Sequence, residues 1–211
     1  DRLDERPDFD PEQPQRSSSL GRFPLDRSVA DPARVQEAAA LLAQAERPIV
    51  IAGGGIHSSQ AWEELEALQS LGIPVATTVM GKGAVDETHP LSIGVVGYFM
   101  APRSRTSHLR SLVTDADVVL LVGNRTNQNG TDSWSLYPEN ARYIQIDIDG
   151  GEIGRNYEAV RLAGDAKLTL SALVEALGKE DTSRIGSRRS QLEQQIASGK
   201  EAHRKELGEL V

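Results

Sequence analysis

The chain has 211 residues, a formal net charge of −8 and no cysteine, and these values exclude several classes of protein. The absence of cysteine rules out disulfide bonds, thiolate metal sites and a thiol nucleophile, and it suits a reducing compartment, so we expect a cytoplasmic protein. The acidic balance argues against a partner that is a nucleic acid. No run of about 18 apolar residues occurs, so no membrane-spanning helix is expected.

The first 30 residues differ in composition from the rest of the chain. They contain four prolines and a run of three serines but no sustained apolar periodicity, so residues 1–30 are predicted to be an extended linker. The chain begins with Asp1 instead of methionine and shows no apolar signal segment. These features suggest a fragment of a longer protein.

Residues 31–178 alternate between helical and strand patterns. Asp31 followed by Pro32 is typical of a helix start, and apolar residues recur at helical spacing over 33–45. Further helices are predicted at 59–71 and at 166–177. Between the helices lie short apolar runs that are typical of buried strands, at 48–52, 73–77, 116–123, 141–148 and 159–164.

The order of these elements predicts the fold. Strands that are apolar throughout and are separated by helices indicate a parallel sheet that is covered on both sides. We therefore predict an α/β fold with a Rossmann-like parallel sheet and helices on both faces. Residues 179–211 are polar, with widely spaced apolar positions. They are expected to bury little surface unless they pack on something outside this chain.

Residues that could bind a ligand follow the predicted strands, and in such a sheet ligands lie at the carboxyl ends of the strands. The glycines 53–55 follow the first strand and could hold a phosphate, or they could form a tight turn. Arg125 follows the third strand and could bind a phosphate or pair with a carboxylate. Asp147 and Asp149 follow the fourth strand, and we favour a ligand contact for Asp147 and a cap for Asp149.

No catalytic constellation or metal site is recognised in the sequence. The glycines 53–55 lack the G-x-G-x-x-G spacing of the dinucleotide fingerprint, and no serine lies in a G-x-S-x-G motif. The histidines show no spacing suited to zinc, and His89, before Pro90, is assigned a structural role. We therefore propose no catalytic and no metal-binding residue and expect a binding module.

Several segments resemble, in sequence and order, the central domain of thiamine-diphosphate-dependent enzymes, and the acetolactate synthase branch is the most similar. The resemblance covers about residues 31–178 and rests on AERPIVIAGGG, LGIPVATTVMGKGAVDETHPLSIGVVG, DADVVLLVGNR, YIQIDIDGGEIGRN and LAGDAK. In that family a whole enzyme has three α/β domains. The first and the last hold thiamine diphosphate and Mg²⁺. The central domain binds FAD in acetolactate synthases, ADP in oxalyl-CoA decarboxylases and no obligatory dinucleotide in pyruvate-decarboxylase-like members.

The resemblance implies that this chain lacks both catalytic domains, since the G-D-G…N motif of the last domain is absent. The chain is then expected to be inactive alone and to bind no thiamine diphosphate itself. Its partners are the missing N- and C-terminal domains, in a homodimer or tetramer. Residues 179–211 would be the connector towards the last domain.

The resemblance also assigns cofactor-binding positions. They are Gly53, Gly54 and Gly55 of the glycine loop, Thr78, Val79 and Met80 on the flavin side, Arg125, the adenosine-side residues Asp147, Ile148 and Ile153, and Asp165 with Ala166. The flavin-side segment departs from the family, because Thr126-Asn127 replaces its Phe-Asp pair and residues 95–100 lack its histidine. Both FAD and ADP stay open as ligands.

Two other functions stay open. One is a free-standing nucleotide-dependent enzyme of sirtuin-like fold, although a chain without cysteine cannot form the zinc ribbon usual in that group. The other is an empty scaffold domain, in which the glycines form a turn and nothing more. Binding of FAD or ADP would separate the scaffold from the nucleotide-binding domain.

Overall fold

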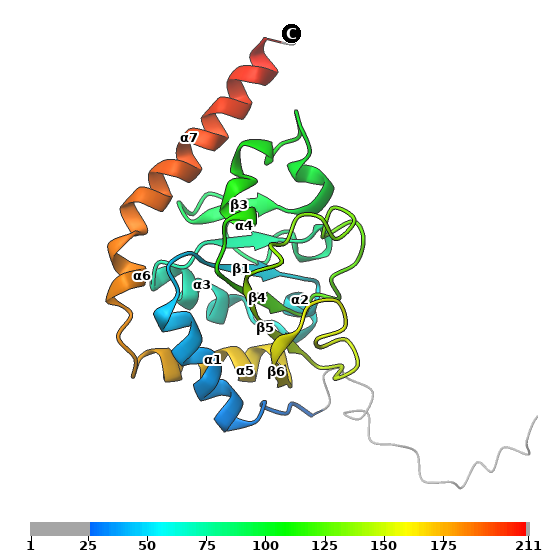
Figure 1. The fold of residues 1–211 in the computed structure, drawn as a ribbon, viewed down its shortest axis with the longest axis vertical. Coiled ribbons are helices and arrows are strands. Elements are labelled where there is room, and N and C mark those ends of the chain that lie inside the picture. The colour runs from blue at the N-terminus through cyan, green and yellow to red at the C-terminus, as the bar shows by residue number, and fades with distance from the viewer. Residues whose placement is uncertain (1–25, 210–211) are drawn as a thin grey trace, which may run out of the picture.

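A computed structural model describes residues 26–209 of the chain; residues 1–25 and 210–211 lie outside the described part. Six strands form one sheet in the order β3-β2-β1-β4-β5-β6 (Figure 1). The strands are β1 Pro48–Ala52, β2 Val75–Thr77, β3 Ser92–Val95, β4 Val118–Val122, β5 Arg142–Asp147 and β6 Ala159–Ala163. Every neighbouring pair is parallel, so all carboxyl ends lie at one edge. The predicted α/β fold is confirmed.

The central strands are the most apolar ones. All residues of β1 and of β4 are buried, which explains why both sequences are apolar throughout. The strand order reverses between β1 and β4, because the chain adds β2 and β3 on one side and β5 and β6 on the other. This reversal is the place where open α/β sheets bind ligands.

One strand, β3, was not predicted from the sequence. Its four residues Ser92–Val95 include Gly94, which has a φ of +102°, and its register with β2 shifts between Val75 and Ala76. A short edge strand with a glycine and a bulge has none of the continuous apolar character of the other strands. The other five strands occur where they were predicted; β1 has the predicted bounds and the other four are shorter.

Five helices cover one face of the sheet. They are α1 Pro32–Gln44, α2 Gly55–Ser59, α3 Trp62–Ser70, α5 Ala166–Leu177 and α6 Ser183–Ser187, and their apolar residues form one core with those of the strands. Asp31 caps α1 as predicted, since its carboxylate accepts a hydrogen bond from Ala33 N at 2.8 Å. The helix predicted at 59–71 occurs as α3 and begins later than predicted, because Gln60 takes a φ of +57° and separates α2 from α3.

The other face is covered by short helices, loops and the C-terminal helix. The turns η3 Gly97–Met100 and η4 Ser107–Leu109, the helix α4 Ser111–Thr114 and part of α7 Arg189–Gly208 pack on a second core. Among residues 26–209, no helix is both long and apolar enough to cross a membrane.

Both ends of the described chain pack on the domain. Ile196 of α7 is 1% exposed, and Gly199 touches Leu109 so closely that a Cβ there would collide with the leucine side chain. Ile196 and Gly199 are nevertheless the only buried residues of α7, so this helix packs on the domain but buries little surface, as expected. At the N-terminal end Ala30 is buried and Arg27 forms an ion pair with Asp165, so the last residues of the predicted 1–30 linker are part of the folded domain.

Candidate functional site

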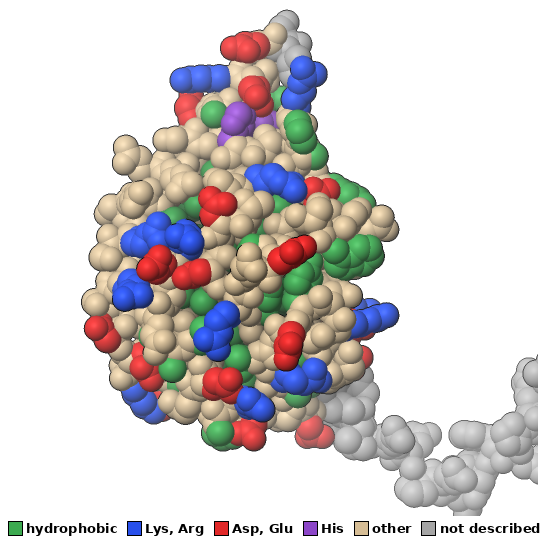
Figure 2. Space-filling model, viewed as in Figure 1, with side chains coloured by type: hydrophobic (Ala, Val, Ile, Leu, Met, Phe, Trp, Pro, Cys, Tyr) green, Lys and Arg blue, Asp and Glu red, His purple; other side chains and the backbone are tan. Residues whose placement is uncertain are grey.

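The predicted site residues lie at the ends of the strands, in the segments that follow them or in the first residues of α2 and α5. Exposed apolar side chains also gather there: Val79, Met80, Tyr98, Phe99, Trp134 and Ile148 all lie in loops that follow strands. Figure 2 shows hydrophobic side chains concentrated on the side towards which the strands point. Exposed apolar surface of this kind often belongs to a binding site.

Two of the three adjacent glycines are explained by packing of the backbone. Gly53 N donates to Val122 O at 2.8 Å, and Gly55 N donates to Gly123 O at 3.2 Å. A Cβ on Gly53 would collide with Gly123 O, and a Cβ on Gly55 would lie 2.6 Å from Gly123 Cα. The loops after β1 and β4 therefore approach so closely that only glycine fits at these two positions.

The third glycine faces the loop after β2. A Cβ on Gly54 would lie 3.2 Å from Met80 Cβ, which is tight contact. The Met80 turn is closed by Thr78, whose hydroxyl accepts a hydrogen bond from Gly81 N at 3.2 Å. Val79 and Met80 are 52% and 72% exposed. The loops after β1 and β2 thus form one packed unit with apolar side chains on its surface.

Asp165 is fully engaged by the fold. Its carboxylate accepts hydrogen bonds from Leu168 N at 3.2 Å and from the Ser59 hydroxyl at 2.8 Å, and it pairs with Arg27 at 3.0 Å. Ala166, the first residue of α5, is buried in the core. The sequence did not predict the roles of Ser59 and Arg27, because both partners of Asp165 lie more than a hundred residues away along the chain.

Asp147, at the end of β5, has a different environment. It is 9% exposed and accepts a hydrogen bond from Asp149 N at 3.0 Å; no other protein donor reaches its carboxylate within residues 26–209. Burial raises the pKa of Asp147, although the Asp149 hydrogen bond and the nearby Arg125 charge oppose this shift. Asp149 itself accepts from Gly151 N at 2.8 Å and closes a turn; no helix begins in this loop, so the helix cap predicted for Asp149 was wrong.

The residues around Asp147 are exposed. Arg125 follows β4, the neighbour of β5, and its side chain is exposed; in the described part of the chain it forms no ion pair within 4.0 Å. Ile148 is 62% exposed, whereas Ile153 is 2% exposed and packs inside the loop between β5 and β6. Of the predicted residues, Arg125, Asp147 and Ile148 after β4 and β5 remain available to a ligand, as do the exposed Val79 and Met80 after β2.

A long loop, residues 124–137, follows β4 and contains Arg125; the sequence indicated its place at a strand end but not its conformation. We call it the bridging loop. Four of its residues have positive φ values between 50° and 60°: Thr126, Asp132, Ser133 and Trp134. Such a conformation costs energy for residues other than glycine and is retained when surrounding contacts enforce it. Here Trp134 Nε1 donates to Thr126 O at 3.0 Å, and Arg110 pairs with Asp132 at 2.8 Å.

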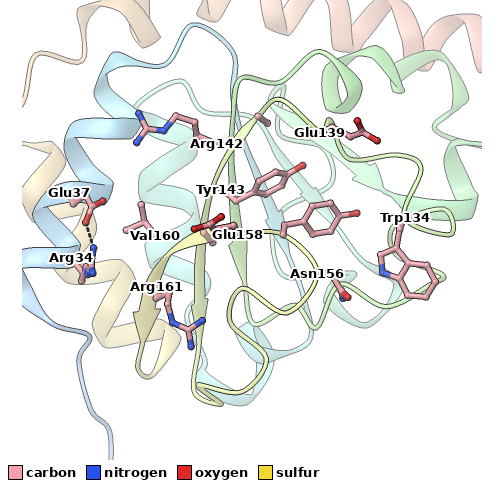
Figure 3. Close-up of a pocket in the computed structure, with 13 residues that line it drawn as sticks. Arg34, Glu37, Trp134, Glu139, Arg142, Tyr143, Asn156, Glu158, Val160 and Arg161 are labelled. Atoms are coloured by element: carbon pink, nitrogen blue, oxygen red, sulfur yellow. Dashed lines mark hydrogen bonds and ion pairs between the residues drawn. The ribbon is translucent and has the colours of Figure 1, made fainter.

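A hollow of about 970 Å³ lies beside the edge strand β6 (Figure 3). Its floor includes Tyr143 and Tyr157, whose rings stack at 4.8 Å. Its charges balance, since three arginines and three glutamates line it: Arg34, Arg142, Arg161, Glu37, Glu139 and Glu158. The hollow runs along β6 and also reaches Trp134 of the bridging loop and Asn156 of the loop after β5, but none of the predicted site residues lines it.

Within residues 26–209, no three histidine, aspartate or glutamate side chains are grouped so that they could hold a metal ion. His89 Nδ1 accepts a hydrogen bond from Leu91 N at 3.1 Å, which is a structural role of the kind predicted.

Comparison with known proteins identifies the family. Residues 35–173 match the family model of the thiamine pyrophosphate enzyme central domain. The chain is 37% identical over 154 residues to an acetolactate synthase large subunit of Parasynechococcus marenigrum, covering 72% of this chain and 23% of that protein. It is 36% identical over 158 residues to a sulfoacetaldehyde acetyltransferase of Castellaniella defragrans, covering 71% and 25%.

A solved structure agrees with the fold. Benzoylformate decarboxylase from Polynucleobacter necessarius superposes with a TM-score of 0.59 at 22% identity, covering 72% of this chain and 28% of that one. The chain spans about a quarter of the length of its relatives. These matches do not favour the sirtuin-like alternative. With an α/β parallel sheet of this order and a family match over most of the described residues, the chain belongs to the thiamine pyrophosphate enzyme central domains and is similar to those of acetolactate synthases.

Proposed function

We propose that this domain binds a nucleotide, either ADP or FAD, at the carboxyl ends of β4 and β5 and supports the assembly of a larger enzyme. The observation that carries the proposal is the environment of Asp147. This carboxylate is nearly buried, accepts a single hydrogen bond from the described protein and lies beside the charge of Arg125. A buried carboxylate with so few donors has capacity to accept hydrogen bonds from a ligand.

The chemistry of Arg125, Asp147 and Ile148 suits a nucleotide. Asp147 can accept hydrogen bonds from ribose hydroxyls, and Arg125 can form a charge-assisted hydrogen bond with a phosphate. The exposed Ile148 offers an apolar surface to a base. All three lie next to the reversal in strand order between β1 and β4, where sheets of this type bind nucleotides.

The larger enzyme is proposed to use thiamine diphosphate and Mg²⁺, as the family name implies. The residues described here do not fit that group, because no cluster of acidic or histidine side chains among 26–209 could hold the metal ion. We therefore assign the thiamine diphosphate site to the domains that would precede and follow this one. We further propose a homodimer or tetramer and an acetolactate-synthase-like reaction for the whole enzyme, and no catalysis by this chain alone.

Calorimetry with the 211-residue chain tests nucleotide binding. ADP or FAD should bind the wild-type chain, and Arg125→Ala should weaken binding by roughly tenfold to a hundredfold, because a charge-assisted hydrogen bond contributes about 1.5–3 kcal/mol. Arg34→Ala is the matched control, since Arg34 is exposed on α1 and pairs with Glu37. Absence of binding by either nucleotide at millimolar concentration would favour the empty scaffold instead.

A further inference from the structure

We infer that Asn129 in the bridging loop is a site of spontaneous chemical modification, at which the side-chain amide is replaced by a carboxylate, and that Asn127 slows this reaction. The attacking group is the backbone nitrogen of the next residue, Gly130. The inference does not depend on the proposed nucleotide binding, because it concerns the chemistry of the loop alone.

Asn129 differs from the other asparagines of the chain in the residue that follows it. The sequence contains asparagine at positions 124, 127, 129, 140 and 156, and Asn129 alone precedes a glycine. The others precede arginine, glutamine, alanine and tyrosine. Because glycine has no Cβ and reaches backbone conformations closed to other residues, its nitrogen can approach the preceding side chain closely. The least hindered attacking nitrogen therefore lies directly after Asn129.

The side chain of Asn129 is accessible. The residue is exposed, and with residues 26–209 its side-chain amide forms no hydrogen bond. Asn124, in contrast, is 5% exposed, and Asn156 Nδ2 donates to the Thr126 hydroxyl at 2.7 Å. Because the last torsion of an asparagine side chain turns easily, the amide carbon of Asn129 can swing toward Gly130 N without breaking a contact with the described protein.

The reaction has two stages and needs water as its only co-reactant. Attack forms a bond between Gly130 N and Asn129 Cγ and closes a cyclic imide. The bond between Cγ and Nδ2 breaks, and Nδ2 leaves as ammonia with the proton that Gly130 N gives up. Water then opens the imide. Cleavage of the bond from Gly130 N to Cγ yields aspartate, and cleavage of its bond to the main-chain carbonyl carbon yields isoaspartate.

Asn127 holds the attacking nitrogen in place. Gly130 N donates to Asn127 Oδ1 at 2.9 Å, and the Thr131 hydroxyl donates to Asn127 O at 2.9 Å. Attack on Asn129 requires that Gly130 N turn away from Asn127 and lose its proton, so the first of these hydrogen bonds must break. One hydrogen bond of this kind changes a rate by about threefold to tenfold. The fold therefore slows the reaction through Asn127 without blocking it.

The modified residue lies where two segments of the chain meet. Tyr98 N donates to Asn129 O at 3.1 Å. Gly97 has a φ of +79°, and a Cβ there would collide with Asn129 O. Isoaspartate lengthens the main chain at this contact, because the chain then runs through the former side chain. The modified loop cannot keep both contacts, so the reaction loosens the bridging loop from the segment that follows β3.

Mass spectrometry of the folded 211-residue chain tests the inference after incubation at mildly alkaline pH. Trypsin releases the peptide 126–142, which contains Asn127, Asn129 and Asn140, and fragmentation assigns the modified residue. We expect the mass gain that accompanies replacement of NH2 by OH at Asn129, with release of ammonia. In urea the reaction should be faster, since the hydrogen bond to Asn127 is then lost.

Variants of Asn127 and Gly130 test the control of the rate. Asn127→Ala removes the acceptor and should speed the modification of Asn129 by about threefold to tenfold. Asn127→Asp is the matched control, because it keeps an acceptor oxygen and should not exceed the wild-type rate. Gly130→Ala should slow the reaction several-fold; its Cβ would lie 3.3 Å from Asn127 Oδ1, a tight contact that a small shift relieves.

Each part of the inference has its own contrary outcome. No mass gain at Asn129 in the folded chain, or earlier modification of Asn127 or Asn140, overturns the assignment of the site. Equal rates in folded wild type and folded Asn127→Ala overturn the role of Asn127. If Asn127→Ala does not fold, the wild type decides, since equal rates in buffer and in urea would show that the fold gives no protection. Nucleotide binding enters none of these measurements.

Discussion

Two regions of the carboxyl edge differ in how the fold uses them. After β1, β2 and β6, glycines pack backbone against backbone and Asp165 accepts three hydrogen bonds or ion pairs. After β4 and β5, Arg125 and Ile148 are exposed, and Asp147 accepts a single hydrogen bond from residues 26–209. We call these the packed region and the available region.

Asp165 and Asp147 show what the difference teaches. Both are buried carboxylates at the ends of neighbouring parallel strands, and by position alone either could contact a ligand. The carboxylate of Asp165 caps α5, accepts a hydrogen bond from Ser59 and pairs with Arg27. The carboxylate of Asp147 accepts one hydrogen bond, so it can accept more from a ligand. The number of donors already bound, and not the place at the strand end, distinguishes a structural carboxylate from a binding one.

The largest expected effect is in the packed region. Gly53→Ala should lower the free energy of unfolding by about 3 kcal/mol or more, because the new Cβ would collide with the Gly123 carbonyl and backbone must move. Urea denaturation measures this loss. Gly150→Ala is the matched control in the loop after β5, where a Cβ meets nothing within 4 Å, and its effect should stay within about 0.5 kcal/mol. Equal stability of the two variants would contradict the close approach.

The next largest effect concerns Asp165. Asp165→Ala should cost about 2–4 kcal/mol of stability, since it removes the α5 cap and leaves Ser59 and Arg27 without their acceptor. Because Asp165 has no role in the available region, the folded variant should bind ADP as the wild type does. Thermal unfolding and calorimetry on the same samples measure both quantities. A variant that keeps its stability and loses ADP binding would reverse the assignment.

Asp147→Asn tests the available region and should affect ligand binding more than stability. We expect it to weaken ADP binding by about tenfold, because a ribose hydroxyl loses a charged acceptor. Stability at neutral pH should not fall, since burial already disfavours the charged form of this carboxyl. Calorimetry and urea denaturation at pH 7 provide the two measurements. Asp149→Asn, at the exposed turn, serves as control and should leave ADP affinity unchanged.

The smallest effect is a pH dependence. Burial raises the pKa of Asp147 in the folded state above its ordinary value of 3.8, so between the two values the folded protein binds more protons than the unfolded one. The contribution of Asp147 to the free energy of unfolding therefore falls as the pH rises from about 3.8 through the folded-state pKa. Denaturation of wild type and Asp147→Asn over this range should show the variant gaining relative stability with rising pH. An opposite trend would mean that Arg125 dominates.

Much of the fold could be predicted because apolar runs and helix-start residues indicate its strands and helices locally. The runs that become β1 and β4 are apolar throughout, and Asp31-Pro32 starts α1 where its capping hydrogen bond is found. The break at Gln60 could not be predicted, since glutamine is an ordinary helix former and its left-handed conformation is imposed by packing. Strand β3 lacked a signal because Gly94 interrupts it.

The sequence predicted where the candidate site lies, but not which of its residues are required for packing of the fold. The glycines 53–55 do follow the first strand, yet Gly53 and Gly55 are required by their contact with Gly123, a residue about seventy positions away. The bridging loop has no sequence signal either, because its positive φ values occur at threonine, aspartate, serine and tryptophan and not at glycine. Contacts between distant segments decide both features, and a single sequence does not display them.

The contact between α7 and the turn η4 determines how the C-terminal helix is oriented. The helix is held against the domain around Ile196 and Gly199, and its end projects beyond the body of the molecule (Figure 1). The helix is also held on both sides of this contact, because Arg189 donates to Ser70 O at 3.0 Å and Glu206 lies 3.1 Å from His108 Nε2. Because His108 and Leu109 are neighbours in η4, a shift of this one turn would move both the middle of α7 and its far end together. The position of η4 therefore sets the direction of α7 relative to the domain.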